Sequence, residues 1–506
     1  MDPAAPGHRL VRFAILRLLG VCYVATFAGA VLQLVPLVGA GGLLPVGDYL
    51  DAVREGLGER AYWEVPTLFW WDHSDAALMA VSGVGLGLAL ALLLGVENAP
   101  LLLGLWVIQI SILHVGQRFY GFGWETQLLE TTLLAALLCP WARVRPLGRQ
   151  EPPFVAVVLL RWLAFRIMLG AGLIKIRGDA CWSDLTCLDF HFETQPNPHP
   201  LSPLWHFAPA WFHRGGVLFN HLAELVLPFL VFGPRRARLV AGVLMALFQL
   251  SLIASGNLSF LNWLTIIPCL ACLDDRFLRR LLPARLRERW APEVEGVAPG
   301  RAWRGLAWGF AALVAWRSVD VVVNLVSPRQ AMNRSFDRLH LVNTYGAFGR
   351  VTRVRHELVI EGSAGDLADE ASWRAYELPC KPGDPGRRPC WITPYHLRLD
   401  WLMWFAAIEA GEAGALAREE WVVHLVDKLL AGDRRIAPLL AVDPFPDAPP
   451  RHVRVLLYRY TFAPLGDNAW WRRERAYELL PPLRHDDPAL RDFIAARGWG
   501  PPPARE

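Results

Sequence analysis

Residues 154–176 read FVAVVLLRWLAFRIMLGAGLIKI, and only Arg161, Arg166 and Lys175 among them carry charge. A helix that crosses a bilayer needs about 20 mostly apolar residues, so this stretch predicts a membrane-spanning helix. The same rule selects eight further stretches, which gives about nine predicted spans. Their approximate limits are 12–38, 76–95, 100–118, 124–140, 154–176, 216–233, 237–255, 257–273 and 303–326.

Charge is distributed unevenly along the chain. The 506 residues are 54% hydrophobic and 19% charged, whereas soluble domains average about 25% charged. Half of the charged residues follow Pro328, in a part that is about a third of the chain. This pattern predicts a polytopic transmembrane helical domain over 1–328 and a soluble domain over 329–506. It excludes a single soluble globule and a disordered chain. The net charge of +4 is too small to indicate a nucleic-acid partner.

Arginine in the short connections indicates the orientation, because cytoplasmic loops are enriched in Lys and Arg. With nine spans, the N-terminal flank and every second connection fall on one side, and these segments hold the clustered arginines. The clusters are Arg9, Arg12 and Arg17; Arg143, Arg145 and Arg149; Arg235, Arg236 and Arg238; and Arg276, Arg279, Arg280, Arg285, Arg287 and Arg289. The pattern predicts a cytoplasmic N-terminus. Because the number of spans is odd, it also predicts an extracytoplasmic C-terminal domain, on the same side as the long loop 177–215.

Lysine is scarce: the chain contains only Lys175, Lys381 and Lys428. Together with the abundance of Ala, Gly, Pro and Leu, this bias toward arginine is typical of a GC-rich genome and indicates a bacterial protein. The bacterial inner membrane is then the expected location, with the C-terminal domain in the periplasm.

Four of the eight cysteines fall outside the predicted spans, on the predicted outer side. Cys181 and Cys187 lie in the loop 177–215, and Cys380 and Cys390 bracket a Pro-Gly turn. Because an oxidising compartment preserves disulfides, each pair is predicted to form one, with free structural thiols as the alternative. Cys269 and Cys272 form a C-x-x-C within an apolar span, which favours buried thiols over redox chemistry.

The C-terminal part alternates short strand-like and helix-like segments. Strands are predicted over 339–345, 355–361, 373–378 and 453–462, and helices over about 396–410 and 414–431. This indicates an α+β domain with a small antiparallel sheet. Its sequence contains no phosphate-binding glycine loop, nucleophile elbow or paired metal motif. Trp470 and Trp471, followed by two arginines, are interpreted as core tryptophans and a solvated charge run.

Several ionisable residues fall within predicted spans, where charge is costly and marks candidate functional sites. They are Glu125, Glu130, Arg161, Arg166, Lys175, His221 and Glu224. The favoured interpretation is structural: acidic residues of one span pair with arginines of the next. For Lys175, snorkelling to the interface is favoured over a role as base or nucleophile. His221 and Glu224 share a helix face, but no familiar ligand spacing is present, so no metal or other cofactor is predicted.

Seven motifs in order along the chain carry a family signature. They are 124–126 (WET), 174–187 (IKIRGDACWSDLTC), 191–196 (HFETQP), 232–236 (FGPRR), 255–263 (SGNLSFLNW), 341–349 (LVNTYGAFG) and 394–401 (PYHLRLDW). In these motifs, from about 124 to 483, the chain closely resembles the lipase maturation factor family. The resemblance implies a polytopic membrane protein whose eukaryotic relatives reside in the endoplasmic reticulum membrane. There they help secreted lipases to fold and assemble into active dimers, and the region after the last span faces the lumen.

Two functional hypotheses follow from these patterns. The first is a membrane-embedded folding or assembly factor, not an enzyme, that binds exported clients (lipases, by the resemblance) without covalent chemistry. Its candidate client-facing residues are Asn343, Tyr345, Phe348, Tyr395 and Trp401. The alternative is an intramembrane enzyme acting on a lipid or on an exported protein, with Glu125, Lys175, His221 and Glu224 lining its site. A transporter is less favoured, because no internal repeat is visible.

Overall fold

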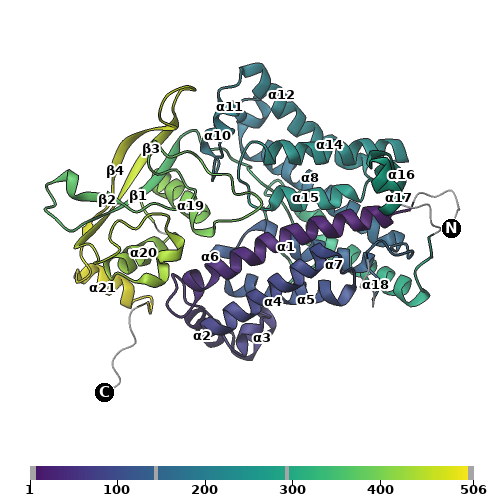
Figure 1. Cartoon of the computed structure of the whole chain (residues 1–506), viewed down its shortest axis with the longest axis horizontal. Helices are drawn as coiled ribbons and strands as arrows, with labels where there is room; N and C mark the ends of the chain where they lie inside the picture. Colours follow the sequence, from purple (N-terminus) through teal and green to yellow (C-terminus); the bar gives the residue numbers. More distant parts are fainter. Residues whose placement is uncertain (1–6, 142–145, 291–295, 417, 500–506) are drawn as a thin grey trace.

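The computed structural model describes residues 7–141, 146–290, 296–416 and 418–499. A helical bundle surrounds α1 (Arg9–Val38), and an antiparallel sheet with its own helices lies against one end of that bundle (Figure 1). Two of the arginines that predict the orientation, Arg143 and Arg145, lie outside the described residues.

Ten helices form the walls of the bundle. They are α1, α4 (Asp75–Leu94), α5 (Ala99–Val115), α7 (Gly123–Leu138), α8 (Phe154–Gly178), α12 (Ala210–His221), α13 (Leu227–Leu230), α14 (Arg235–Ile253), α15 (Leu261–Leu270) and α18 (Arg301–Val326). Short helices in the connections are α2 (Val46–Leu57), α3 (Ala61–Glu64), α6 (Gln117–Tyr120), α9 (Ala180–Ser183), α10 (Leu188–Thr194), α11 (Ser202–His206), α16 (Asp275–Leu281) and α17 (Ala284–Trp290).

Five described helices are long and apolar enough to cross a membrane: α1, α4, α8, α14 and α18. Each of the other four predicted spans also contains helix, but in shorter pieces. Helices α5, α7 and α15 have 17, 16 and 10 residues. In the predicted span 216–233, a π-helical turn at Leu222–Val226 separates α12 from α13. Helix length therefore supports five spans directly, and the count of nine stays a prediction.

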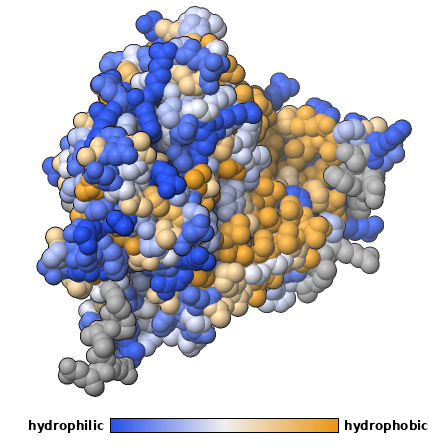
Figure 2. Space-filling model, turned by 60° about the vertical axis from the view of Figure 1, so that its left-hand side comes forward, coloured by the Kyte–Doolittle hydropathy of each residue, from blue (hydrophilic) through white to orange (hydrophobic). Residues whose placement is uncertain are grey.

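A belt of exposed apolar side chains covers the face of the bundle seen in Figure 2 and stops at the C-terminal domain. In Figure 2 the hydrophobic surface covers the bundle, whereas the surface of the domain is mainly hydrophilic. Phe229, Leu250, Trp316 and Val323 are among the exposed members of this belt. Soluble monomers rarely expose contiguous apolar patches of this kind, so the belt indicates that the bundle lies in a membrane.

The helix ends far from the sheet are joined by polar contacts. The backbone N–H groups at the start of α1 donate to Asp275, and Arg235 at the start of α14 pairs with Asp274 at 2.7 Å. Burial raises the pKa of the Asp275 carboxyl to about 6. In Figure 1 this start of α1 lies beside α16, at the opposite end of the molecule from the sheet. The bundle therefore has two distinct ends, and only one of them carries the C-terminal domain.

The C-terminal domain contains the predicted small antiparallel sheet. Its elements are β1 (Arg355–Ser363), β2 (Trp373–Ala375), α19 (Arg398–Ala413), α20 (Trp421–Leu430), β3 (His452–Phe462), β4 (Trp471–Leu483) and α21 (Pro488–Ala495). The strand order is β2-β1-β3-β4, and every pair is antiparallel, with Leu358 opposite Leu457 in the centre. Helix α19 packs against β1.

One strand predicted for this domain is absent, and one strand of the sheet was not predicted. Residues 339–345 form no strand, because Asn343 and Tyr345 are drawn into the bundle, as described below. β4 was not predicted as a strand, although the interpretation of its residues is confirmed: Trp471 is buried and the charged run after it is exposed. β4 is the edge strand and is largely exposed, and charged side chains are common on edge strands because they discourage pairing with other chains.

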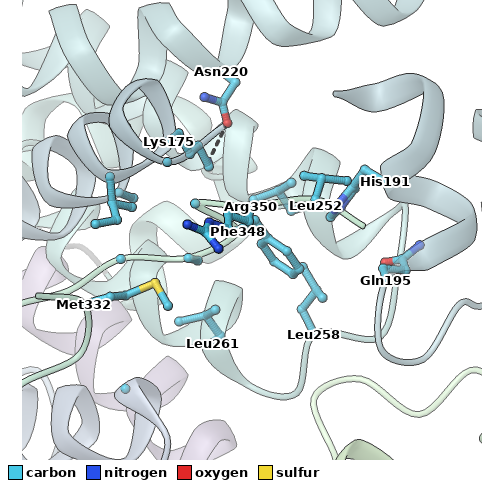
Figure 3. A pocket seen from close by; sticks show the side chains of 18 of the residues that line it. Lys175, His191, Gln195, Asn220, Leu252, Leu258, Leu261, Met332, Phe348 and Arg350 are labelled. Atoms are coloured by element: carbon cyan, nitrogen blue, oxygen red, sulfur yellow. Dashed lines mark hydrogen bonds between the residues drawn. The ribbon is translucent and has the colours of Figure 1, made fainter. Parts of the chain in front are cut away.

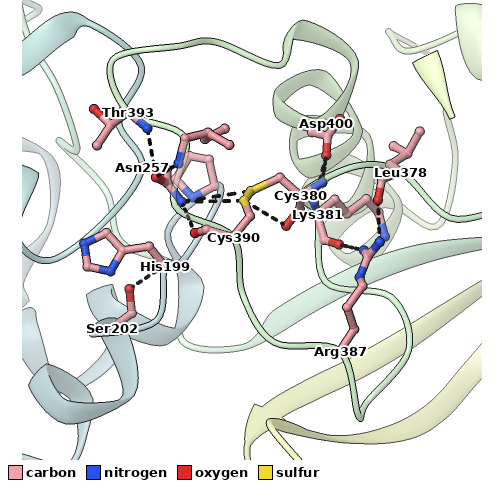
Figure 4. The surroundings of a disulfide bond; sticks show 12 residues. His199, Ser202, Asn257, Leu378, Cys380, Lys381, Arg387, Cys390, Thr393 and Asp400 are labelled. Atoms are coloured by element: carbon pink, nitrogen blue, oxygen red, sulfur yellow. Dashed lines mark hydrogen bonds between the residues drawn. A yellow bond between two sulfur atoms is a disulfide. The ribbon is translucent and has the colours of Figure 1, made fainter. Parts of the chain in front are cut away.

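The loop that contains Cys380 and Cys390 is held from two sides (Figure 4). On one side, Asp400 in α19 accepts from the backbone N–H groups of Cys380 and Lys381 at 2.6 and 2.7 Å. On the other, Asn257 of the bundle donates to the carbonyl of Cys390 at 2.9 Å. Burial raises the pKa of the Asp400 carboxyl to about 6, against the effect of these hydrogen bonds.

We predict that Asp400→Asn removes a pH dependence of stability. The pKa of an unfolded Asp is about 3.9, so between about pH 4 and pH 6 the folded state binds more protons, and the carboxyl lowers stability as pH rises. The amide keeps an acceptor oxygen and carries no buried charge. Thermal unfolding followed by tryptophan fluorescence in detergent is expected to show a flatter pH profile for this variant.

The control is Asp400→Ala, which leaves two buried N–H groups without their acceptor. It is expected to lower the free energy of unfolding by about 1–3 kcal/mol at every pH. An unchanged pH profile in Asp400→Asn would contradict the assignment.

Candidate functional site

Glu130 in α7 is the centre of a buried polar cluster. Its carboxylate pairs with Arg166 of α8, and it accepts from the hydroxyl of Tyr345 at 2.7 Å and from the side chain of Asn343 at 3.1 Å. Arg166 in turn donates to the backbone carbonyl of Asn343 at 2.8 Å. The predicted pairing of an acidic residue with an arginine of the next span is therefore present here, extended by two residues from beyond the bundle.

Glycines on α8 allow residues 343–351 to lie against the helix. A Cβ at Gly170 would meet the backbone carbonyl of Tyr345, and a Cβ at Gly178 would meet that of Gly349. A side chain at either position would thus push the segment away from α8. The spacing of the two glycines fixes the path along which Asn343 and Tyr345 reach Glu130.

Glu125, one turn earlier in α7, has a partner that the sequence did not suggest. Its carboxylate pairs with Arg398 at the start of α19 at 2.9 Å and accepts from Gln109 at 2.7 Å. Arg398 also donates to the carbonyl of Phe119 at 2.8 Å, and its guanidinium lies over the ring of Tyr120. The α7 helix thus binds the C-terminal domain through two separate carboxylates.

Lys175 does not snorkel to the interface, contrary to expectation. The side chain is buried, and its Nζ lies 2.6 Å from Glu224 and 2.8 Å from the amide oxygen of Asn220. Glu224 belongs to the π-helical turn, which is frequently found at functional sites. Burial of a charge is tolerated when it is paired and hydrogen-bonded, and this three-residue arrangement meets both conditions.

The remaining predicted membrane residues have separate surroundings. Arg161 pairs with no carboxylate among the described residues: it donates to the carbonyl of Ala271 at 2.8 Å and contacts the ring of His8. His221 lies 2.9 Å from the carbonyl of Trp182. Of the four residues proposed to line one site, the structure brings Lys175 and Glu224 together, whereas Glu125 pairs with Arg398 and His221 lies beside Trp182.

A cavity of about 1380 Å³ opens between the bundle, the loop 177–215 and the C-terminal domain. Lys175, Glu224 and Asn220 line its wall, and so do Tyr345, Phe348 and Trp401. Figure 3 shows Arg350 and Phe348 in the middle of the view, with Lys175 above them and Leu258 and Leu261 below. The lining consists mainly of aromatic and aliphatic side chains.

The candidate client-facing residues lie at the contact between the two parts of the chain. Asn343, Tyr345 and Trp401 are buried there, Phe348 is half-buried in the cavity wall, and Tyr395 accepts from Gln33 of α1 at 2.9 Å. The structure therefore gives each of them a partner inside the protein, and their contact with clients stays a prediction.

Both predicted disulfides are present. Cys181 is joined to Cys187 and Cys380 to Cys390, with Cα–Cα distances of 4.8 and 5.4 Å. The other four cysteines are free and buried. Both bonds lie on the side of the bundle that carries the C-terminal domain.

The loop 177–215 is attached to the sheet by charged groups. Arg355 of β1 donates to the carbonyls of Glu193 and Pro196, and Asp179 pairs with Arg353 at 2.8 Å. The hydrogen bond from Arg353 lowers the pKa of Asp179 to about 2. Burial, and then the charge of Lys175, lower the pKa of His191 to about 4. His191 is therefore neutral at pH 7. It lines the cavity as an uncharged ring and adds no second positive charge beside Lys175.

Within the described ranges, no three His, Cys, Asp or Glu side chains are grouped so that they could hold a metal ion.

Comparison with known sequences covers both parts of the chain. A family model described as the Lipase maturation factor transmembrane domain matches residues 10–280, and one described as the Lipase maturation factor C-terminal domain matches residues 341–481. The chain belongs to the lipase maturation factor family. It is 47% identical to lipase maturation factor 1 of Bos taurus, over 97% of this chain and 91% of that protein. No solved structure matches the chain.

The chain is also similar to other members of the family. Lipase maturation factor 1 of Homo sapiens is 45% identical over 97% of this chain and 90% of its own length. Lipase maturation factor 2 of Mus musculus is 30% identical over 96% of this chain and 85% of its own length. The match therefore extends across the membrane domain and the C-terminal domain together.

Family motifs coincide with the contacts between these two domains. Asn343 and Tyr345 lie in the motif 341–349, and Asn257 lies in the motif 255–263. Sequence reasoning missed Arg398 and Asn220 as functional candidates. Arg398 lies within the motif 394–401, and this position could have identified it as a candidate. For Asn220 the only indication in the sequence is its i, i+4 spacing from Glu224.

We predict that Glu130→Gln strongly destabilises the protein. Loss of the carboxylate leaves Arg166 as a buried, unpaired charge, which costs about 3–5 kcal/mol, and weakens the attachment of Asn343 and Tyr345. The control is Glu64→Gln, which breaks exposed pairs with Arg60 and Arg338 and is expected to cost less than about 1 kcal/mol.

The measurement is thermal unfolding in detergent, together with limited proteolysis between the two domains. Equal stability of the two variants would contradict the central role assigned to Glu130.

Proposed function

We propose that this protein is a membrane-embedded maturation factor that helps exported lipases to fold and assemble, without covalent chemistry, from the extracytoplasmic side. The observation that carries the proposal is the match to proteins named lipase maturation factor, which runs through both domains. The rigid attachment of the C-terminal domain to one end of the bundle gives such a factor a fixed platform close to the membrane surface.

The proposed orientation places the C-terminal domain outside the cytoplasm. The predicted count of nine spans is odd, so it separates the domain from the N-terminus; five of these spans are helices long and apolar enough to cross a membrane. Both disulfides lie on the domain side, which fits an oxidising compartment. Arg235 and Arg238 lie at the opposite end, which fits a cytoplasmic face. In a bacterial host this arrangement corresponds to the inner membrane with the domain in the periplasm.

The alternative function is an intramembrane enzyme that would use Glu125, Lys175, His221 and Glu224. Of its four proposed residues, only Lys175 and Glu224 line the cavity. They form an ion pair supported by Asn220, and such a buried pair also stabilises the packing of helices without any reaction.

We predict that co-expression of this protein raises the activity per mass of an exported lipase in a bacterial host whose genome lacks a family member. A folding factor increases the active fraction of its client and leaves the client's synthesis unchanged. Secreted lipase is quantified by immunoblot and by ester hydrolysis, with Glu130→Gln as the folding-deficient control. Unchanged specific activity for every lipase tested would overturn the proposal.

The paired variant Lys175→Met with Glu224→Leu distinguishes the factor from the enzyme. Replacement of a buried ion pair by apolar residues of similar volume is often close to neutral for stability, so a maturation factor is expected to keep most of its effect on the lipase. An enzyme that uses either group is expected to lose its activity completely. The single variant Lys175→Met, which leaves Glu224 buried and unpaired, is the destabilised reference.

A further inference from the structure

The cavity between the bundle and the C-terminal domain is large and mostly apolar. Pockets for drug-sized ligands measure about 300–1,000 Å³, and this one reaches about 1380 Å³. Met168 of α8, Phe248 and Leu252 of α14 and Leu261 of α15 line its inner part. These helices also belong to the bundle whose outer surface carries the apolar belt. The inner part is thus suited to a long hydrocarbon chain.

The opening of the cavity lies at the edge of this belt. Trp211 and Gly215 of α12 and Arg329, just beyond the end of α18, line the cavity and are exposed. The nearby Val326, at the end of α18, is also exposed. Exposed tryptophan is typical of the boundary between lipid and water, so the opening is placed where a lipid can enter from the bilayer.

Two exposed arginines, Arg329 and Arg350, line the cavity. The guanidinium groups of Arg329 and Arg350 form no hydrogen bond or ion pair with the part of the chain that the structure describes. Among the other charged groups of the wall, Lys175 pairs with Glu224 and Arg118 pairs with Glu419. Arg177 donates to the carbonyl of Leu325 and to the side chain of Gln330, and Glu412 also lines the cavity. Basic pockets between membrane helices bind anionic head groups.

We propose that the cavity binds an anionic acyl lipid, with its head group at Arg329 and Arg350 and a hydrocarbon chain directed toward Leu252 and Leu261. The apolar walls would contact the hydrocarbon chain, and the two guanidinium groups would bind the negatively charged head group. The opening at the edge of the apolar belt would let the lipid enter from the bilayer. The lipid would fill the space between the bundle and the C-terminal domain, and its binding requires no client.

The first test closes the opening. A Cβ at Gly215 meets no atom within 4 Å, so Gly215→Trp places an indole at the opening without a clash. The matched control is Gly309→Trp on α18, where a Cβ also meets nothing within 4 Å and which does not line the cavity. Full-length proteins are purified in mild detergent, and retained lipid is counted by native mass spectrometry and identified by chromatography.

The parent protein and Gly309→Trp are expected to retain about one anionic acyl lipid per chain, and Gly215→Trp several-fold less. Equal lipid content in all three proteins would overturn the proposal, because the retained lipid would then lie elsewhere.

The second test removes the charge. Arg350→Gln is expected to weaken retention of anionic lipid about fivefold, and the double variant with Arg329→Gln further, since a basic residue near such a head group contributes about 1 kcal/mol. Arg459→Gln, an exposed arginine of β3 that does not line the cavity, is the control.

Competition with nanodiscs that contain phosphatidylglycerol or phosphatidylcholine, or with inorganic phosphate alone, identifies what is recognised. Preference for phosphatidylglycerol that Arg350→Gln abolishes supports the proposal. Equal binding of both lipids, or displacement by phosphate alone, contradicts it. Because the readout is lipid retention, it remains informative whether or not lipase maturation is observed.

Discussion

The carboxylate of Glu130, buried among α7, α8 and the segment 343–345, is the constraint on which the rest of the architecture depends. A charge in such a place is stable only when all its hydrogen-bonding capacity is used. Arg166 supplies the opposite charge, and Asn343 and Tyr345 supply the remaining donors. Two of these four groups come from beyond the bundle, so the membrane domain is incomplete without the start of the C-terminal part. This requirement anchors one domain to the other at a defined point.

The same principle is repeated around the contact between the domains. Glu125 binds Arg398 at the start of α19, Arg355 of β1 binds carbonyls of the loop 177–215, and Asn257 binds the disulfide loop at Cys390. Each contact is specific in geometry as well as in charge, so the domain has one orientation on the bundle (Figure 1). With the domain in that orientation, residues of the bundle, of the loop 177–215 and of the domain together line the large cavity.

The parts of the fold that depend on local pattern could be predicted. Apolar length identified the long helices, alternation identified β1 and β3, and the predicted compartment identified the cysteine pairs. The errors have a common cause. The strand expected at 339–345, the snorkelling of Lys175 and the pairing of Arg161 were all judged from sequence neighbours, whereas their partners lie far away in the chain. Asn343, for example, is 213 residues from Glu130.

The sequence by itself determined that the chain has a membrane bundle followed by an α+β domain, that its two outer cysteine pairs are joined, and that its motifs belong to one family. These properties follow from hydropathy, periodicity and motif order, which are readable along the chain. Only the tertiary structure decided which carboxylate binds which cation, that Lys175 pairs with Glu224 in the wall of a cavity, and that the guanidinium groups of Arg329 and Arg350 find no partner there in the part of the chain that the structure describes. The physical reason is that buried charges select their partners by distance and desolvation in three dimensions, and no regularity of the sequence encodes that choice.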